Sequence, residues 1–316
     1  MEGINMRKRK LGNTGLKVSE IGFGSWQLGN TQRWKGATGE QAIKLVKKAI
    51  DMGCDFFDTA PVYAGGNSEK LLGKVLKDKR DQVKISTKFG NFPDGTTDFS
   101  ASLLRKSVED SLERLQTDYV DTLLLHGPPM EDLKGEGNHF EILQNLKNEG
   151  LIKSYGASVD TSEEMIALME STDSKVIEIM FNILYQEPKK AFKMAAEKGV
   201  GLIVKVPLDS GWLTGKYDEN SSFNGVRERW SENVIKRRAK LVDKIKGIKN
   251  QEISMVEEAL RFILAYPEVS TVIPGIRNNQ QLEENLNAAQ KQMSSQQVKK
   301  YEKLYEENIK DNPLPW

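Results

Sequence analysis

Four polar residues lie at the ends of predicted strands and carry the groups of a proton-transfer site. Asp58 and Tyr63 occur in the segment FFDTAPVY. Lys88 lies near the end of VKISTKFG, and His126 near the end of VDTLLLHGP. The preceding runs are apolar and β-branched or aromatic, which is typical of strands buried on both faces. Parallel α/β folds carry their chemistry at the carboxyl ends of such strands. We therefore expect an acid, a phenol, an amine and an imidazole at one rim.

These four groups suit general acid catalysis on a carbonyl oxygen. A phenol titrates near 10 and is a poor proton donor at neutral pH, but a nearby ammonium such as Lys88 lowers that pKa. Asp58 would hold the ammonium, and His126 can donate a hydrogen bond to an oxygen bound between it and Tyr63. Each residue taken alone is more often structural. Their joint placement favours catalysis.

The four groups can transfer a proton but cannot supply electrons, so we expect the site to use a cofactor. The chain has two histidines and one cysteine, too few for a persuasive redox metal cluster, so no metal site is predicted. A hydride-donating cofactor is the natural complement to the four groups.

Strand-like and helical segments alternate after a short predicted hairpin over residues 7–18. The strand-like segments are IGFGS, CDFFDTA, VKISTKF, YVDTLLLH, IKSYGAS, VIEIMFN, GLIVKVPL and STVIPGI. Helical patterns such as GEQAIKLVKKAIDMG separate them, and a last one covers residues 294–310. Eight such units fit a closed parallel barrel better than an open sheet. We predict an α/β fold, a (β/α)8 TIM barrel with an N-terminal β-hairpin and a C-terminal helix, as one domain over residues 1–316.

One predicted connection, from residue 209 to about residue 250, is unusually long. Long loops in compact domains are often functional lids. The segment SSFNGVRERW, residues 221–230, is a candidate cover for a ligand. Trp212, Phe92 and Trp230 are further candidates to line or cover the mouth of the site.

Composition excludes several classes of function. The 316 residues carry 46 Lys plus Arg against 45 Asp plus Glu, a net charge of +1, so no global field favours nucleic acid or a membrane surface. No apolar run approaches the roughly 20 residues that span a bilayer, and no apolar segment of a signal peptide follows MEGINMRKRK. The single cysteine, Cys54, is expected to be a buried, reduced thiol. These features indicate a cytoplasmic protein.

An ordered series of motifs resembles the aldo-keto reductases from about residue 9 to residue 290. The motifs are LGNTGLKVSEIGFGSWQLG, FFDTAPVYAGGNSEKLLGKVL, STKFG, LLLHGPP, PLDSGWLTGKY and VIPGIRNNQQLEENL. In that family the fold is a (β/α)8 barrel, and NADPH reversibly reduces aldehydes or ketones. The resemblance implies that Tyr63 is the general acid/base, Lys88 modifies its pKa and Asp58 partners Lys88. It implies that His126 orients the substrate carbonyl.

Two loops are candidates for the cofactor phosphates. PLDSGWLTGKY follows the seventh predicted strand, and its glycines let backbone N–H groups approach a pyrophosphate, with Lys216 adding charge. The alternative is a plain glycine-containing turn. The loop after the eighth strand opens a helix, and Arg277 there suits the 2′-phosphate of NADP. No GxGxxG follows the first strand, so a Rossmann site is excluded. Together with the resemblance, the predicted NADP(H)-binding residues are Gly24, Ser25, Trp26, Asp58, Ser158, Glu178, Lys205, Pro207, Leu208, Ser210, Gly211, Leu213, Gly215, Lys216, Gly275, Arg277, Gln281, Glu284 and Asn285.

Three positions depart from the family pattern at the nicotinamide end. Ser158 is followed by Val159 where many members have Asn, Glu178 replaces a common Gln, and Lys205 replaces a common aromatic ring. A lone buried Glu or Lys is costly, so we predict a Glu178–Lys205 ion pair beside the nicotinamide. Ser158 alone would keep the usual amide contact.

The leading hypothesis is an NADPH-dependent reductase of a small-molecule carbonyl, which in reverse transfers hydride from the alcohol to NADP. Trp26, Tyr63 and His126 are the predicted substrate residues, with core packing as the alternative for Trp26. A second hypothesis is an NADP-binding regulatory or sensor protein with weak turnover. A hydrolase or lyase would need a metal site or a substrate phosphate site, and the sequence shows neither. The physiological substrate, the favoured direction and the oligomeric state are not determined by the sequence.

Overall fold

The core of the protein is a sheet of eight parallel strands. The computed structural model describes residues 6–29, 36–223, 225 and 228–315. Within these residues the sheet order is β10-β9-β8-β7-β6-β5-β4-β3. The strands are β3 (Phe23–Gly24), β4 (Phe56–Asp58), β5 (Lys84–Phe89), β6 (Val120–His126), β7 (Ile152–Val159), β8 (Val176–Met180), β9 (Gly201–Lys205) and β10 (Val269–Val272).

The first and last strands of this sheet meet and close it into a barrel. Parallel bridges join Ile21 to Val272 and Gly24 to Gly275. The Gly22 N–H donates to the Val272 carbonyl at 2.8 Å. A Cβ on Gly24 would lie 2.7 Å from the Ile273 carbonyl oxygen, so this close approach requires glycine. The predicted (β/α)8 barrel is confirmed.

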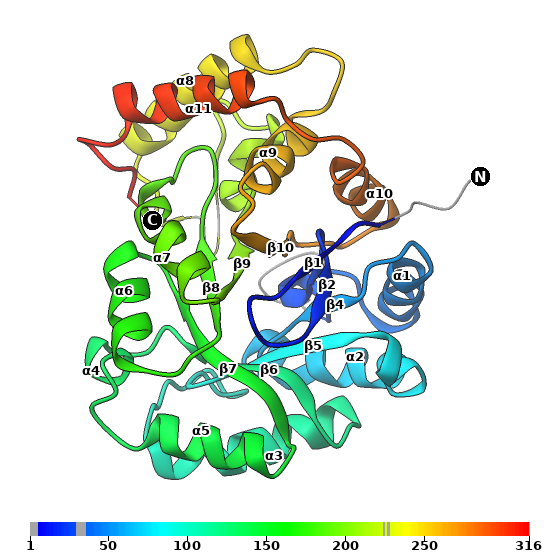
Figure 1. Cartoon of the computed structure of the whole chain (residues 1–316). Helices are drawn as coiled ribbons and strands as arrows, with labels where there is room; N and C mark the ends of the chain where they lie inside the picture. Colours follow the sequence, from blue (N-terminus) through cyan, green and yellow to red (C-terminus); the bar gives the residue numbers. More distant parts are fainter. Residues whose placement is uncertain (1–5, 30–35, 224, 226–227, 316) are drawn as a thin grey trace.

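Helices surround the strands on the outside of the barrel (Figure 1). Their inward faces are apolar; α1, for example, buries Ala42, Leu45, Val46 and Ala49. The α-helices are α1 (Gly39–Asp51), α2 (Asn67–Leu76), α3 (Leu104–Leu115), α4 (Met130–Leu133), α5 (His139–Asn148), α6 (Ser162–Ser171), α7 (Phe192–Glu197), α8 (Glu232–Ile248), α9 (Met255–Leu264), α10 (Asn279–Ala288) and α11 (Ser295–Asn308). In this part of the chain every helix falls short of the length and apolar character that a membrane crossing requires.

The long connection after β9, in which the sequence predicted no helix, contains helical segments. It contains the 3-10 segment η6 (Asp209–Thr214) and the 17-residue helix α8. Helix α8 was missed because its basic residues interrupt the apolar pattern, although Ala239, Val242 and Ile245 form a buried face. The predicted cover at residues 221–230 includes residues 224 and 226–227, which lie outside the described residues.

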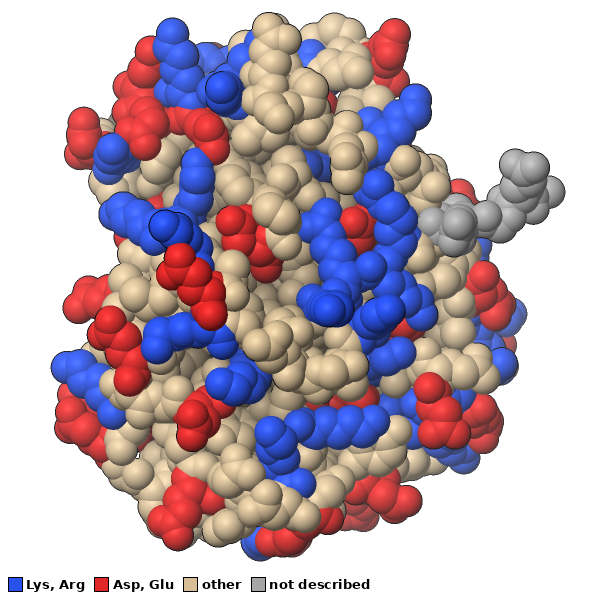
Figure 2. Space-filling view, viewed as in Figure 1, with Lys and Arg blue, Asp and Glu red and all other residues tan. Residues whose placement is uncertain are grey.

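The N-terminal hairpin lies across the N-terminal ends of the barrel strands, as Figure 1 shows. Strands β1 (Lys8–Lys10) and β2 (Lys17–Ser19) pair antiparallel, as predicted. Arg9 Nε donates to Glu20 at 2.7 Å, and its Nη1 donates to the Val269 carbonyl at 2.8 Å. Basic side chains gather over this hairpin on the face seen in Figure 2. The hairpin is thus fastened to the barrel by charged hydrogen bonds.

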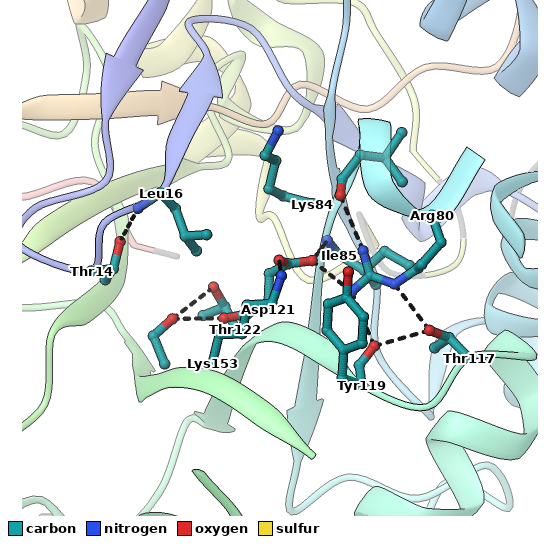
Figure 3. Close-up of polar contacts among 12 residues, drawn as sticks. Thr14, Leu16, Arg80, Lys84, Ile85, Thr117, Tyr119, Asp121, Thr122 and Lys153 are labelled. Carbon is teal, nitrogen blue, oxygen red and sulfur yellow. Dashed lines mark hydrogen bonds and ion pairs between the residues drawn. The ribbon is translucent and has the colours of Figure 1, made fainter. Parts of the chain in front are cut away.

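A buried carboxylate at the start of β6 organises the same end of the barrel (Figure 3). Asp121 Oδ2 accepts from Arg80 Nη2 at 2.7 Å and from the Ile85 N–H at 3.0 Å. Lys153 Nζ lies 3.0 Å from the other oxygen, Oδ1. The Arg80 guanidinium also stacks 3.8 Å above the Tyr119 ring centroid. Both oxygens of Asp121 are therefore partnered by donors from neighbouring segments.

Candidate active site

Neighbouring strands bring the predicted catalytic residues to the carboxyl end of the barrel. Asp58 ends β4, Lys88 lies near the end of β5, and His126 ends β6. Tyr63 begins the 3-10 segment η2 (Tyr63–Gly66), which follows β4. Its N–H donates to the Ala60 carbonyl at 3.1 Å, so a tight turn presents the phenol to the rim. The structure therefore places all four residues at one end, as the strand pattern indicated.

Lys88 is the centre of the site and has two carboxylates as neighbours. Its ammonium is 2.6 and 2.7 Å from the two oxygens of Asp58 and donates to the Thr59 carbonyl at 3.0 Å. Glu178 Oε2 lies 3.2 Å from the same nitrogen. Burial alone would lower the pKa of Lys88, but the charges of Asp58 and Glu178 outweigh burial and raise it. Lys88 is therefore a fixed cation at any physiological pH.

The predicted Glu178–Lys205 ion pair is wrong. Glu178 pairs with Lys88, and Lys205 Nζ lies 3.0 Å from Asp160 Oδ1. The reason is register: Lys205 is aligned with Met180, two residues further toward the rim than Glu178.

Ser158 joins the two side chains instead. Lys205 Nζ donates to Ser158 Oγ at 2.9 Å. Ser158 Oγ in turn donates to Glu178 Oε1 at 2.9 Å. The Ser158 hydroxyl, which we expected to keep a contact with the cofactor amide, is thus engaged on both sides by protein groups.

Asp58 and Glu178 place two carboxyl groups around one lysine. Burial and the charge of Glu178 raise the pKa of Asp58 to about 8, against the lowering effect of Lys88. Burial also acts to raise the pKa of Glu178, but Lys88, Lys205 and His126 outweigh it and lower that pKa to about 2. The two carboxyls therefore titrate as a coupled pair, in which Asp58 has the higher pKa.

Tyr63 has a higher pKa than the sequence led us to expect. Burial raises its pKa; Lys88 lowers it, as anticipated, but Asp58 and Glu178 raise it further. The Lys88 nitrogen lies 5.4 Å from the Tyr63 ring centroid. The second carboxylate, whose effect the sequence could not reveal, offsets the influence of the ammonium. Tyr63 is accordingly protonated, and its raised pKa makes it a weaker acid than the sequence led us to expect.

His126 is a neutral imidazole beside Tyr63. The two ring centroids are 6.1 Å apart, with an interplanar angle of 83°. Burial, and then the charge of Lys88, lower the pKa of His126 to about 3. Its Nδ1 is buried and has no partner among the described residues. A ligand oxygen between the two rings would receive hydrogen bonds from a phenol and an imidazole.

A cavity of about 980 Å³ opens over these residues. Tyr63, His126 and Trp26 line it, as predicted for a substrate pocket. Most of the predicted cofactor residues also line it: Gly24, Ser25, Trp26, Asp58, Glu178, Lys205, Pro207, Leu208, Ser210, Gly211, Lys216, Gly275, Arg277 and Gln281. The other predicted cofactor residues are not among those that line it: Ser158, Leu213, Gly215, Glu284 and Asn285.

Sequence reasoning missed some residues of the cavity wall and predicted others that do not line it. Asn91 and Asp160 line it, and each follows a strand end, which is the signal that identified the catalytic four. Trp212 and Trp230 do not line it; they are buried with their ring centroids 5.9 Å apart. Phe92 lies instead on a small separate depression.

The loop after β9 turns its backbone sharply beside the cavity. Ser210 and Gly211 have φ values of 53° and 99°, in the left-handed region. The buried carboxylate of Asp209 pairs with Arg238 of α8, which fixes the start of this turn. Such turned backbone presents N–H groups to anions.

The loop after β10 leads into α10, whose first turn faces the same cavity. The Asn278 side chain caps the helix by accepting from the Gln281 N–H at 2.9 Å, and the Arg277 N–H donates to Gln281 Oε1 at 3.1 Å. The half-buried Arg277 side chain lines the cavity. Asn285 Nδ2 is buried without a partner among the described residues. These donors fit a long, phosphate-bearing ligand such as a dinucleotide.

The chain is similar to proteins of one family along almost its whole length. The model of the aldo/keto reductase family matches residues 20–306. L-galactose dehydrogenase of Arabidopsis thaliana is 32% identical over 289 residues, covering 89% of this chain and 87% of the relative. A probable voltage-gated potassium channel subunit beta of the same plant is 29% identical, covering 90% and 91%. The NADH-specific methylglyoxal reductase of Escherichia coli strain K12 is 27% identical, covering 90% and 93%.

A solved structure agrees with these relatives. The holo form of the aldo-keto reductase AKR11C1 from Bacillus halodurans superposes with a TM-score of 0.82 at 28% identity, covering 95% of this chain and 96% of the other. The barrel, the rim residues and the sequence matches lead to the same family. The chain belongs to the aldo/keto reductase family, whose members are oxidoreductases that act on carbonyl and alcohol groups with nicotinamide cofactors.

Proposed function

We propose that this protein is an NADPH-dependent carbonyl reductase that works reversibly on an aldehyde or ketone. The observation that carries the proposal is the buried Lys88–Asp58 pair beside Tyr63 and His126, on the wall of a cavity large enough for a cofactor and a small substrate. The shape of the site and its charged groups are those that proton transfer to a carbonyl oxygen requires.

The chain's own residues perform the proton chemistry. The substrate oxygen lies between Tyr63 and His126, and the neutral imidazole donates a hydrogen bond that orients it. Tyr63 donates its proton as negative charge develops on that oxygen, and Lys88 stabilises the phenolate that remains. When bound, the nicotinamide cofactor supplies the hydride. In the reverse direction the Tyr63 phenolate accepts the proton of the alcohol.

NADP(H) rather than NAD(H) is the proposed cofactor because of Arg277. Its guanidinium lines the cavity at the start of α10, where a fork of donors suits a terminal phosphate. Lys216 lines the same cavity and adds positive charge near the turned loop after β9. Gly275, Gln281, Glu284 and Asn285 would surround the adenosine. Because one relative is named as NADH-specific, this preference needs a direct measurement.

A cofactor-binding regulatory protein is the alternative, and two observations favour it. One relative is named as a channel beta subunit. In addition, Glu178 and Lys205 occupy the nicotinamide end and pair with other residues of the chain. Both features are compatible with tight binding and slow turnover. The complete set of Asp58, Tyr63 and Lys88 favours the reductase.

The decisive experiment follows NADPH oxidation with a panel of aldehydes and ketones. We expect turnover with at least one carbonyl, and transfer of deuterium to the product from NADPH labelled at the nicotinamide. A binding titration by cofactor fluorescence runs in parallel. Tight NADPH binding with no turnover on any member of the panel would contradict the reductase and support the regulator.

A further inference from the structure

Backbone strain in this protein is concentrated in the loop after β9. Within the residues that the structure describes, five residues other than glycine have a φ in the left-handed region. Three of the five are in this loop: Val206 at 51°, Asp209 at 46° and Ser210 at 53°. For a β-branched residue such as Val206 this conformation is a genuine outlier. Strained conformations of this kind persist only where surrounding contacts impose them, and they cluster at functional sites.

The strained loop forms part of the cavity wall. Val206, Ser210 and Gly211 line the cavity, and Lys216 lines it a few residues further along the chain. Backbone turned in this way presents N–H groups to an anion, and Lys216 adds positive charge. A loop that relaxed to ordinary φ values would change the direction of those N–H groups. The contacts that impose the strain therefore also determine whether this wall can bind a phosphate.

Arg238 of α8 holds the loop from outside the cavity. Its guanidinium pairs with the carboxylate of Asp209, and both side chains are almost completely buried. Arg238 Nη2 also donates to the Pro315 carbonyl at 2.8 Å. The guanidinium carbon lies 5.0 Å from the centroid of the Trp230 ring. Arg238 does not itself line the cavity, so any effect that it has on a ligand passes through the loop.

The Asp209–Arg238 pair contributes geometry more than stability. A buried ion pair adds little net stability, because the loss of hydration offsets the attraction between the charges. The pair does require the Asp209 side chain to point at α8, which keeps this residue in its left-handed conformation. At the start of the loop, Asn182 Nδ2 donates to the Val206 carbonyl at 3.1 Å, and the same carbonyl accepts from the Asp209 N–H at 3.2 Å. The loop is thus held at both ends.

We propose that Arg238 is a positioning residue for the cofactor: through Asp209 it keeps the loop after β9 in the conformation that binds the pyrophosphate. The inference rests on the proposed function, in which NADPH occupies this cavity. Without the ion pair the strained loop relaxes, and the conformation that binds the cofactor becomes a minor population. The apparent affinity for the cofactor then falls in proportion to that population.

This role differs from that of Arg277, which lies on another loop and is assigned to the 2′-phosphate. A ligand that has the 2′-phosphate but no pyrophosphate, such as adenosine 2′-phosphate, does not need the loop after β9. Loss of Arg238 should therefore weaken NADPH but not adenosine 2′-phosphate. At saturating NADPH the bound cofactor itself selects the competent loop, so the turnover number should change little. General damage to the fold would instead lower both affinities and the turnover number.

The test compares Arg238→Met with Arg237→Met, a matched control. Arg237 is the preceding residue of α8 and donates to the carbonyls of Asn308 at 3.2 Å and Pro313 at 3.4 Å. A second variant combines Arg238→Met with Asp209→Asn, so that no unpaired charge stays buried and folding is less at risk. Asparagine also tolerates the left-handed conformation. Calorimetric titration measures the affinities for NADPH and adenosine 2′-phosphate, and steady-state assays at saturating NADPH measure turnover.

In Arg238→Met and in the double variant we expect NADPH affinity to fall about tenfold to a hundredfold. The affinity for adenosine 2′-phosphate should stay within about twofold of wild type, and turnover at saturating NADPH within about threefold. Arg238→Lys, which restores the charge, should recover part of the NADPH affinity, and Arg237→Met should match wild type.

Unchanged NADPH affinity in both Arg238 variants would overturn the positioning role while the reductase stands. An equal loss of both ligands, or the same loss in Arg237→Met, would overturn it as well. Wild-type protein that binds NADPH but reduces no carbonyl would overturn the reductase alone, because the affinities still test Arg238. Wild-type protein that does not bind NADPH would overturn both.

Discussion

At the N-terminal end of the barrel Asp121 receives an arginine, a lysine and a backbone N–H, so that both of its oxygens are partnered. At the C-terminal end Asp58 and Glu178 share Lys88, and Glu178 Oε2 accepts no hydrogen bond from the described residues. The first arrangement closes a network, which stabilises the fold. The second places two carboxyl groups on one buried ammonium, which costs stability and permits chemistry.

The N-terminal end of the barrel therefore stabilises the fold and the C-terminal end carries the candidate active site, as is general in parallel barrels. Asp55 repeats the closed pattern near the hairpin: it is 2.8 Å from Lys8, 3.2 Å from Lys84, and accepts from the Ser19 N–H at 2.7 Å. Substitutions at the C-terminal end should consequently lower activity more than stability, and substitutions at the N-terminal end should lower stability more than activity.

The largest expected effect is on activity at the C-terminal end. In Lys88→Met the Tyr63 phenolate loses its stabilising cation, and we expect carbonyl reduction to fall about a thousandfold. Lys84→Met is the matched control, since Lys84 begins the same strand and pairs with Asp55 at the other end. Steady-state assays measure both variants. Turnover by Lys88→Met within tenfold of wild type would contradict the catalytic role of this end of the barrel.

The next effect is a dependence of stability on pH that comes from Asp58. Its pKa is raised to about 8 in the fold, above an unfolded value of about 3.9, so folding favours the protonated form. This contribution to stability is fully present below about pH 4 and is lost as pH rises to about 8. Glu178, whose pKa is lowered to about 2, contributes constantly between about pH 5 and about pH 8.

We therefore expect the free energy of unfolding of the wild type to fall between about pH 5 and about pH 8 more steeply than that of Asp58→Asn. Urea unfolding at these two pH values measures the difference. Equal slopes in the two proteins would contradict the raised pKa of Asp58.

At the N-terminal end the expected effect is on stability alone. Asp121→Asn leaves Arg80 and Lys153 without their anion, and we expect a loss of about 3 kcal/mol of unfolding free energy. Turnover at saturating substrate should stay within twofold of wild type. Lys153→Met should cost less than about 1 kcal/mol, because Lys153 is 45% exposed. An Asp121→Asn variant that is as stable as the wild type but inactive would contradict the claim that this end contributes to stability alone.

The smallest expected effect is on cofactor discrimination at the rim. Arg277→Ala should weaken NADPH binding about tenfold to a hundredfold and leave NADH binding nearly unchanged, because only NADPH has the 2′-phosphate. Glu283→Gln is the control: Glu283 lies on α10 but pairs outside the cavity with Lys48. Fluorescence titration with both cofactors measures the ratio. Equal weakening of both would refute the phosphate assignment.

Much of the barrel could be predicted because its signals are local. Each of the eight buried strands is a short apolar run, and the residue that follows it is placed at the rim by the parallel topology alone. Asp58, Lys88 and His126 were found in this way. Helix α8 was missed because basic residues, among them the buried Arg238, interrupt its apolar pattern.

The pairing inside the site could not be predicted, because it depends on register and burial. Glu178 and Lys205 lie on adjacent strands, but Lys205 lies two residues further toward the rim. Glu178 therefore pairs with Lys88, and Lys205 pairs with Asp160. The net pKa of Tyr63 likewise depends on how two carboxylates and one ammonium surround it. Strand patterns give the strand of each residue but not these distances.

The most direct test of the reductase is the Tyr63→Phe variant, which removes one oxygen atom from the site. NADPH oxidation with an active carbonyl and NADPH binding by fluorescence are measured side by side on this variant and the wild type. We expect turnover to fall about a thousandfold while NADPH binding stays within about twofold, because Tyr63 contributes the transferred proton. Turnover that survives in Tyr63→Phe at the wild-type rate would contradict the assignment of Tyr63 as the acid.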